Sequence, residues 1–221
     1  MPQETENEIR KDYRSGIEPS EAFLLLMGEN NQSEIVLASA SPRRSELMAL
    51  AGVACRVVPA DICEDVLPDE LPADHVVRLS HEKAEAVARR AAGRFFIGAD
   101  TIVLLDGAIL GKPVDTDDAV RMLSRLSGRD HEVITGFTVF DKISGDHISR
   151  SVRTEVTFKK LTEREIAAYI ATGCPMDKAG GYAIQGGAVH FVRSISGSYS
   201  NVIGLPMTEL YEALQTMQAV E

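Results

Sequence analysis

Hydrophobic and polar positions divide the chain into an irregular start and a regular remainder. Residues 1–33 are polar and acidic, with no sustained periodicity beyond a short helix predicted over 20–27. Such a segment has too little apolar surface to pack stably and is typical of a flexible extension. From residue 34 onward, short apolar runs alternate with stretches of helical periodicity. We therefore expect an acidic N-terminal extension at 1–33, flexible or loosely docked, and a single folded domain at 34–221.

The folded part is predicted to alternate strands and helices. Its first strand leads directly into a helix, because Ser41 and Pro42 form an N-cap and first-turn pair. A tight hairpin turn is predicted at Asp106 and Gly107. This order of elements predicts an α/β fold with a mixed twisted sheet flanked by helices. The expected strands span 34–39, 56–58, 95–99, 102–105, 108–110, 133–140, 149–158, 181–184 and 189–195, and the expected helices span 42–52, 72–92, 115–127, 162–173 and the segment after 206.

Two of these helices carry more specific signals. The helix over 115–127 has Val120, Leu123 and Leu126 on one face, which we expect to point inward. Thr162 and Glu165 have the spacing of a capping box, in which each side chain accepts a backbone N–H of the other residue. The capping box predicts that a helix begins just after residue 162.

Composition narrows the class of protein. Of the 221 residues, 44% are hydrophobic, and no apolar run is long enough to cross a bilayer. The net charge of −10 opposes nucleic-acid binding, so a polyanionic ligand needs a local cluster of basic residues. Cys55, Cys63 and Cys174 are odd in number and lack CxxC spacing, which argues against a disulfide framework and a zinc knuckle. We read no export signal and expect a cytoplasmic protein that binds neither membranes nor nucleic acid.

The segment 39–44, with the sequence SASPRR, is a candidate for binding phosphate. It places hydroxyl groups, free backbone N–H groups and two guanidinium groups at a strand-to-helix junction. The alternative is an ordinary capped surface helix on which Arg43 and Arg44 are solvated. The segment by itself leaves both interpretations open.

Charged residues also follow the predicted strands. Asp100 comes directly after the apolar run 95–99, which predicts a carboxylate at the carboxyl edge of the sheet, where open α/β proteins bind ligands. The alternative is an aspartate that caps a turn. Lys112, within the sequence GKP, either returns to the same edge or lies in an exposed turn. A P-loop is excluded, because Pro113 stands where that motif requires serine or threonine.

A glycine-rich segment, 176–187, combines charges, an aromatic ring and an amide. Its glycines permit a close approach of backbone to a ligand, and Asp177 and Lys178 could bind metal and phosphate. The alternative is a glycine-rich turn beside a strand. A second polar loop, 197–201, is explained more simply by positioning the last helix. The histidines lack the spacing of a zinc site, so any metal would be held by oxygen atoms.

Five short motifs together resemble the Maf family of nucleotide pyrophosphatases. They occur in the family's order and span about residues 34–215. The resemblance implies an α/β fold with two lobes around a nucleotide-binding cleft, a homodimer, and hydrolysis of nucleoside triphosphates between the α and β phosphates with Mg²⁺ or Mn²⁺. The motifs are SASPRR at 39–44, GADTIV at 98–103, GKP at 111–113, MDKAGGYAIQG at 176–186 and GSYSNVIGLP at 197–206.

The resemblance also implies roles for individual residues. The aspartate of GADT is the family's proton acceptor and corresponds to Asp100, so we expect it to activate a water molecule for attack on the α-phosphorus. Lys83 and Lys112 would share in catalysis. Glu64 survives from a family acidic pair in which Cys63 replaces an aspartate. The expected metal ligands are Glu64, Asp100 and Asp177, and the expected substrate-binding residues are Ser39, Ser41, Arg43, Arg44, Thr101, Lys178 and Gln185.

Three positions bear on the choice of nucleotide. The family branch that acts on dTTP and UTP has arginine, threonine and glutamine where this chain has Arg43, Thr101 and Gln185, whereas the branch preferring 7-methyl-GTP has tryptophan at the first. This chain contains no tryptophan, and the amide of Gln185 could pair with a pyrimidine edge. We expect dTTP and UTP as substrates. Two alternatives stay open: a pyrophosphatase for modified or purine nucleotides, and a nucleotide-binding regulator of cell division with little turnover.

Overall fold

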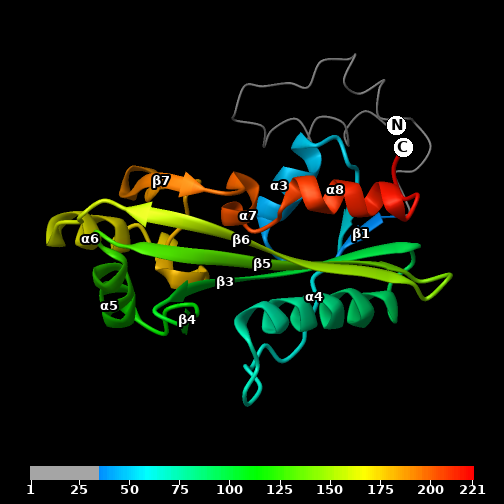
Figure 1. Ribbon diagram of the computed structural model, residues 1–221, viewed down its shortest axis with the longest axis horizontal. Helices are drawn as coiled ribbons and strands as arrows, with labels where there is room; N and C mark the ends of the chain where they lie inside the picture. Colours follow the sequence, from blue (N-terminus) through cyan, green and yellow to red (C-terminus); the bar gives the residue numbers. More distant parts are fainter. Residues whose placement is uncertain (1–34) are drawn as a thin grey trace, which may run out of the picture.

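The computed structural model describes residues 35–221, and the proposed extension with its short predicted helix lies outside the described residues. The strands are β1 (Ile35–Leu37), β2 (Arg56–Val57), β3 (Phe95–Leu105), β4 (Ala108–Leu110), β5 (Asp130–Asp141), β6 (His147–Phe158) and β7 (Val192–Ser196). In this part of the chain they form one seven-stranded sheet in the order β2-β1-β3-β5-β6-β7, with β4 paired to β3 (Figure 1). β1 is parallel to β2 and β3, and the other pairs are antiparallel, so the sheet is mixed as predicted.

Helices cover both faces of this sheet. They are α3 (Pro42–Leu50), α4 (Pro72–Ala88), α5 (Thr116–Leu126), α6 (Glu163–Ile170), α7 (Tyr199–Ile203) and α8 (Met207–Thr216). Figure 1 shows α4 along one face, with α3, α7 and α8 on the other and α5 and α6 at one end of the sheet. No helix within residues 35–221 has both the length and the apolar content needed to cross a bilayer. The predicted α/β class is confirmed.

The apolar core is divided by the sheet. On the α8 side, Leu37, Met48 and Leu210 belong to one buried cluster, which fills the space between the sheet and the helices that cover it. Phe96 and Val87 belong to another cluster, between the sheet and α4. A third cluster lies toward α5 and α6 and includes Leu123, Phe158, Tyr182 and Phe191. Burial of these large side chains supplies the main driving force for the fold.

Two glycines in the sheet allow α4 to pack unusually close to its backbone. A Cβ atom at Gly98 in β3 would lie 1.9 Å from the carbonyl oxygen of Ser80, and one at Gly136 in β5 would lie 2.3 Å from that of Val76. Any larger residue would therefore force the helix away from the sheet. This contact sets the height at which α4 side chains enter the functional site.

Local sequence signals predicted several element boundaries correctly. The turn between β3 and β4 has Asp106 and Gly107 at φ angles of 53° and 78°, as a tight hairpin requires. Thr162 and Glu165 form the predicted capping box at the start of α6. The hairpin of β5 and β6 is confirmed and is longer than predicted at both strands.

Other predictions were wrong in identifiable ways. The segment 181–184 is not a strand, because Gly180 and Gly181 have φ angles of 67° and 69° and close a 3-10 turn. Residues 189–191 are also 3-10, so β7 begins at Val192. The polar loop 197–201 contains the start of α7. Val120 is 39% exposed, because α5 packs inward through Ala119, Leu123 and Leu126 instead. The helix expected over 72–92 ends at Ala88.

Candidate active site

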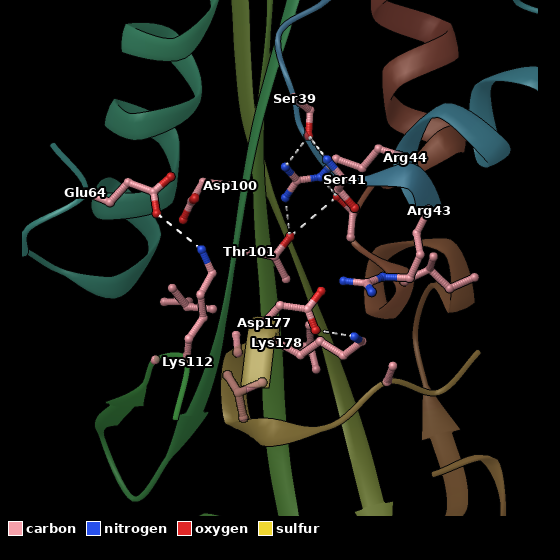
Figure 2. A pocket seen from close by; sticks show the side chains of 18 of the residues that line it. Ser39, Ser41, Arg43, Arg44, Glu64, Asp100, Thr101, Lys112, Asp177 and Lys178 are labelled. Carbon is pink, nitrogen blue, oxygen red and sulfur yellow. Dashed lines mark hydrogen bonds and ion pairs between the residues drawn. The ribbon is translucent and has the colours of Figure 1, made fainter. Parts of the chain in front are cut away.

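One cavity of about 550 Å³ gathers residues that are far apart in sequence. Its walls come from the end of β1, the start of α3, the loop before α4, the middle of β3 and the segments around 111 and 177–185. Figure 2 shows the labelled side chains of this cavity. Every residue predicted to belong to the site lines it: Ser39, Ser41, Arg43, Arg44, Glu64, Lys83, Asp100, Thr101, Lys112, Asp177, Lys178 and Gln185.

Asp100 does not lie at the end of a strand, as the sequence suggested. β3 continues to Leu105, because its pairing with β5 extends from Phe95 to Leu104 without a break. The parallel neighbour β1 ends at Leu37, which pairs with Ile97. Asp100 therefore lies beyond the carboxyl end of β1. Its carboxylate is at the predicted edge, but this edge belongs only to the parallel part of the sheet.

Lys83 links the two carboxylates that approach each other in the cavity. Its Nζ atom lies 2.6 Å from Oδ1 of Asp100 and 2.6 Å from Oε1 of Glu64. The side chains of Lys83 and Asp100 are only 9% and 12% exposed, so this ion pair is largely removed from water. Lys112 approaches the other oxygen of Glu64 at 3.8 Å. Two acidic groups and two ammonium groups thus share one corner of the cavity, and Figure 2 shows Glu64, Asp100 and Lys112 of this group.

Glu64 is held in its ionised form by this arrangement. Burial raises the pKa of its carboxyl group, but the hydrogen bond and charge of Lys83 oppose it, and the charges of Lys112 and Arg44 add to that effect. The net result is a pKa below the usual value. Glu64 is therefore available as an anionic group over the whole neutral range.

Arg44 is already occupied by protein acceptors. Its Nε donates to the carbonyl oxygen of Gly204 at 2.7 Å, and its Nη1 donates to Ala99 O at 2.9 Å and Ser39 Oγ at 3.1 Å. Its Nη2 donates to Thr101 Oγ1 at 3.0 Å (Figure 2). Burial lowers the pKa of this guanidinium, against the opposing charge of Asp100. Arg44 thus joins α3, β1, β3 and the end of α7, and little of its hydrogen-bonding capacity remains for a ligand.

A buried polar network continues beneath Thr101, and sequence reasoning missed most of it. Thr101 Oγ1 lies 2.9 Å from Oγ1 of Thr135, which donates to the carbonyl oxygen of Asn201 at 3.1 Å. The amide of Asn201 donates to Val133 O at 3.0 Å and to Thr154 Oγ1 at 2.9 Å. The polar loop motif at 197–201 was the only available signal. The network fixes the hydroxyl of Thr101 at the floor of the cavity.

Arg43 and Gln185 differ from Arg44 in being uncommitted. Neither side chain hydrogen-bonds to another residue within 35–221, and both line the cavity. Ser41 occupies the N-cap position of α3 as predicted, but its hydroxyl makes no capping hydrogen bond. Its backbone N–H donates to Ser39 Oγ at 3.2 Å. The side chains of Arg43, Gln185 and Ser41 can therefore bind a ligand without breaking an existing hydrogen bond between described residues.

The adjacent side chains of Asp177 and Lys178 form an ion pair on the rim of the cavity. The hydrogen bond from Lys178 lowers the pKa of Asp177, although burial opposes this, and Asp177 remains 74% exposed. Among residues 35–221, no three histidine, cysteine or acidic side chains come close enough to form a metal-binding group. The predicted three-carboxylate shell of Glu64, Asp100 and Asp177 is therefore not assembled.

The two inner carboxylates nevertheless fit a divalent cation of the Mg²⁺ type. Glu64 and Asp100 both contact the Nζ atom of Lys83, so the two carboxylates lie close together, and a cation bound to both would lie beside this ammonium group. Mg²⁺ is commonly held by one or two carboxylates together with substrate phosphates and water, without a complete protein cage. Carboxylate, carbonyl and water oxygens are suitable ligands for both Mg²⁺ and Mn²⁺.

Comparison with known proteins gives a consistent picture. The family model described as "Maf-like protein" matches residues 34–217. A dTTP/UTP pyrophosphatase of Citrifermentans bemidjiense is 60% identical over 85% of this chain and 97% of its own length. One from Geotalea uraniireducens is 59% identical over 86% and 98%. A solved structure of a nucleoside-triphosphatase / dITP/XTP pyrophosphatase of Mycobacterium abscessus is only weakly similar, with a TM-score of 0.36 and 14% sequence identity. The similarity covers 58% of this chain and 75% of that chain. The chain belongs to the family of Maf-like proteins.

Proposed function

We propose that this protein hydrolyses dTTP and UTP to the nucleoside monophosphate and pyrophosphate. The observation that carries the proposal is the convergence of Glu64, Lys83 and Asp100 in a cavity that Arg43, Lys112 and Lys178 also line. Relatives that are 60% identical over most of the chain bear the name dTTP/UTP pyrophosphatase. The cavity's basic residues meet the requirement that an acidic protein must bind a polyanion at a locally positive site.

The triphosphate binds where the basic groups are free to donate. Arg43 and the backbone N–H groups at the start of α3 bind phosphate oxygens on one side, and Lys112 and Lys178 bind them on another. Lys178 exchanges its exposed partner Asp177 for phosphate at small cost, because such surface ion pairs contribute little. Arg44 is a positioning residue that holds Ser39 and Thr101 in place.

The chemical step is attack of a water molecule on the α-phosphorus. Asp100 accepts the proton from that water, a new P–O bond forms, and the bond between the α-phosphorus and the bridging oxygen breaks. Pyrophosphate leaves with the electron pair, stabilised by Lys83 and Lys112. Glu64 and Asp100 would hold Mg²⁺ or Mn²⁺ together with substrate oxygens, and the bound cation would further neutralise the phosphate charge.

The base is selected by Gln185, whose side-chain amide has no hydrogen-bond partner within residues 35–221, together with Thr101. The amide of Gln185 offers a donor and an acceptor, which match the N3–H and O4 edge shared by thymine and uracil. Thr101, fixed by Arg44 and Thr135, presents a hydroxyl of defined orientation nearby. A site built on hydrogen bonds rejects bases that leave its polar groups unpaired.

One assay tests the proposal. Purified protein is incubated with Mg²⁺ or Mn²⁺ and dTTP, UTP, CTP, GTP or 7-methyl-GTP, and monophosphate and pyrophosphate are measured. We expect both products from dTTP and UTP at the highest kcat/KM. Preference for 7-methyl-GTP or GTP would instead indicate a pyrophosphatase for modified or purine nucleotides, and binding without products would indicate a regulator. The homodimer and the cytoplasmic location stay predictions, and sedimentation of the purified protein tests the first.

A further inference from the structure

Glu64 lies in a segment that has no regular structure to fix it. We call residues 58–71, between β2 and α4, the acidic loop; it contains neither helix nor strand, and most of its residues are exposed. Glu64 must nevertheless reach Lys83, whose Nζ atom it contacts at 2.6 Å. Since the loop buries little apolar surface, its conformation has to be set by polar contacts.

Arg78, on α4, makes the most extensive of these contacts. Its Nε and Nη2 donate to the two carboxylate oxygens of Glu70 at 2.5 and 2.9 Å, a bidentate pair. The same Nη2 donates to the backbone carbonyl oxygen of Asp65 at 3.0 Å. Its Nη1 lies 3.2 Å from Glu82 one helical turn further on. Arg78 thereby ties α4 to both ends of the stretch 65–70, and Asp65 is the next residue after Glu64.

Glu70 closes the same network from the loop side. Its Oε2 also accepts from the backbone N–H of Leu67 at 3.1 Å and lies 2.9 Å from Nδ1 of His75. The Glu70 side chain is only 8% exposed. The hydrogen bond from Arg78 lowers the pKa of Glu70 to about 2, with burial opposing it. Glu70 is therefore a fixed anion, and the loop folds around it.

We propose that Arg78 is a positioning residue of the active site, which holds the acidic loop through Glu70 and Asp65 so that Glu64 stays against Lys83. The proposal rests on the proposed function for its kinetic consequence. α4 carries both Arg78, which fixes the loop, and Lys83, which meets Glu64. One helix thus supplies a residue of the site and the support that aligns the acidic loop with that residue.

Loss of Arg78 should act on turnover through Glu64. In Arg78→Gln the loop keeps its sequence but loses its bidentate anchor and the contact to Asp65, so Glu64 samples positions away from Lys83. Removing the outer partner of such a group typically lowers activity about 10-fold to 100-fold. We expect a fall of this size in kcat for dTTP, with KM changed less, and partial recovery in Arg78→Lys.

A double-mutant cycle tests whether the effect passes through Glu64. Arg78→Gln is made in the wild-type chain and in Glu64→Gln, and kcat is compared. In the Glu64→Gln background, we expect Arg78→Gln to lower kcat by less than about a further twofold. Equal losses in both backgrounds would overturn the proposal. Glu70→Gln, which preserves side-chain shape, serves as a second variant. It should lower kcat less than Arg78→Gln does, and this loss should also disappear in the Glu64→Gln background.

Hydrogen exchange of the full-length protein gives a readout that needs no substrate. In Arg78→Gln the hydrogen-bonded amides of Leu67 and Glu70 in the acidic loop should exchange at least about tenfold faster, while those of β3 and β5 keep their wild-type rates. Arg89→Gln removes an exposed ion pair with Glu85 on the same helix and is the matched control, expected to change neither exchange nor kcat. Unchanged exchange in the loop would contradict the proposal. If Glu64→Gln is inactive, or if the protein does not hydrolyse dTTP, the hydrogen-exchange measurement tests the proposal without the kinetic cycle.

Discussion

Lys83 and Asp100 lie 2.6 Å apart although one belongs to a helix and the other to the sheet beneath it. The distance follows from the packing of α4 directly on the backbone of β3 at Gly98. From this position Lys83 also reaches Glu64 on the acidic loop. Three parts of the fold, namely helix, sheet and loop, therefore depend on one ammonium group for their alignment at the site.

Replacing Lys83 should lower turnover by far more than a loss of folded protein would explain. In Lys83→Met, the carboxylates of Glu64 and Asp100 face each other without the cation between them, and phosphate loses a donor. We expect kcat for dTTP to fall about 100-fold. Lys160→Met, an exposed lysine outside the cavity, is the control for loss of a surface charge. A Lys83→Met enzyme within a few-fold of wild type would contradict this role.

Gly98 should tolerate no side chain. A methyl group there would lie 1.9 Å from Ser80 O and 2.8 Å from the backbone nitrogen of Ala84, so α4 must move. We expect Gly98→Ala to lower the free energy of unfolding by about 3 kcal/mol or more. Thermal or denaturant unfolding measures the change. Gly186→Ala, whose new Cβ would meet its nearest neighbour at 3.7 Å, should unfold like wild type, and equal stability of the two variants would refute the packing argument.

Gln185 should govern discrimination between pyrimidine bases. Its amide makes no hydrogen bond within residues 35–221 and lines the cavity, so its loss leaves the fold unchanged. In Gln185→Ala, we expect the ratio of kcat/KM for UTP over CTP to fall about tenfold, the worth of one well-placed hydrogen bond. Gln215→Ala, on α8, provides the matched control. An unchanged ratio in Gln185→Ala would place base selection elsewhere.

His131 should make the fold less stable in mild acid. Burial lowers its pKa from 6.5 to about 4, against the opposing charge of Asp130, and its Nε2 lies 2.8 Å from the hydroxyl of Tyr182. As the pH falls below 6.5, His131 therefore becomes protonated in the unfolded chain, whereas in the folded chain it stays neutral down to about pH 4. The free energy of unfolding should fall by up to about 3 kcal/mol across this interval.

Urea unfolding at several pH values tests this linkage. Between pH 6.5 and 4, the free energy of unfolding should depend less on pH in His131→Gln than in wild type. His190→Gln, which replaces an exposed histidine, should show the wild-type pH dependence. If wild type and His131→Gln lose stability in parallel over this range, the buried histidine is not the cause.

Features that depend on neighbouring residues in sequence could be predicted. The capping box of Thr162 and Glu165 and the hairpin turn at Asp106 and Gly107 are specified by side-chain and backbone chemistry within a few residues. All of the predicted site residues line one cavity. Glu64 and Lys83 were indicated by the family resemblance, and the others also lay in the five short motifs.

Features that depend on tertiary contacts could not be predicted. The extension of β3 past Asp100 results from its pairing with β5, from Thr101 with Thr135 to Leu104 with Glu132. Arg44 looked like a phosphate ligand, but its acceptors on Ala99, Thr101 and Gly204 exist only in the folded chain. The same holds for Asn201, whose partners lie on β5 and β6. Hydrogen bonds between distant segments leave no local sequence pattern.

Pyrophosphate release by Asp100→Asn tests the central claim most directly. Asparagine keeps the shape of the side chain and its place between Lys83 and the sheet, but it cannot accept the proton from the attacking water. With saturating dTTP and Mg²⁺, we expect the variant to unfold at the same temperature as wild type and to release pyrophosphate about 1,000-fold more slowly. Release at close to the wild-type rate would show that Asp100 is not the base.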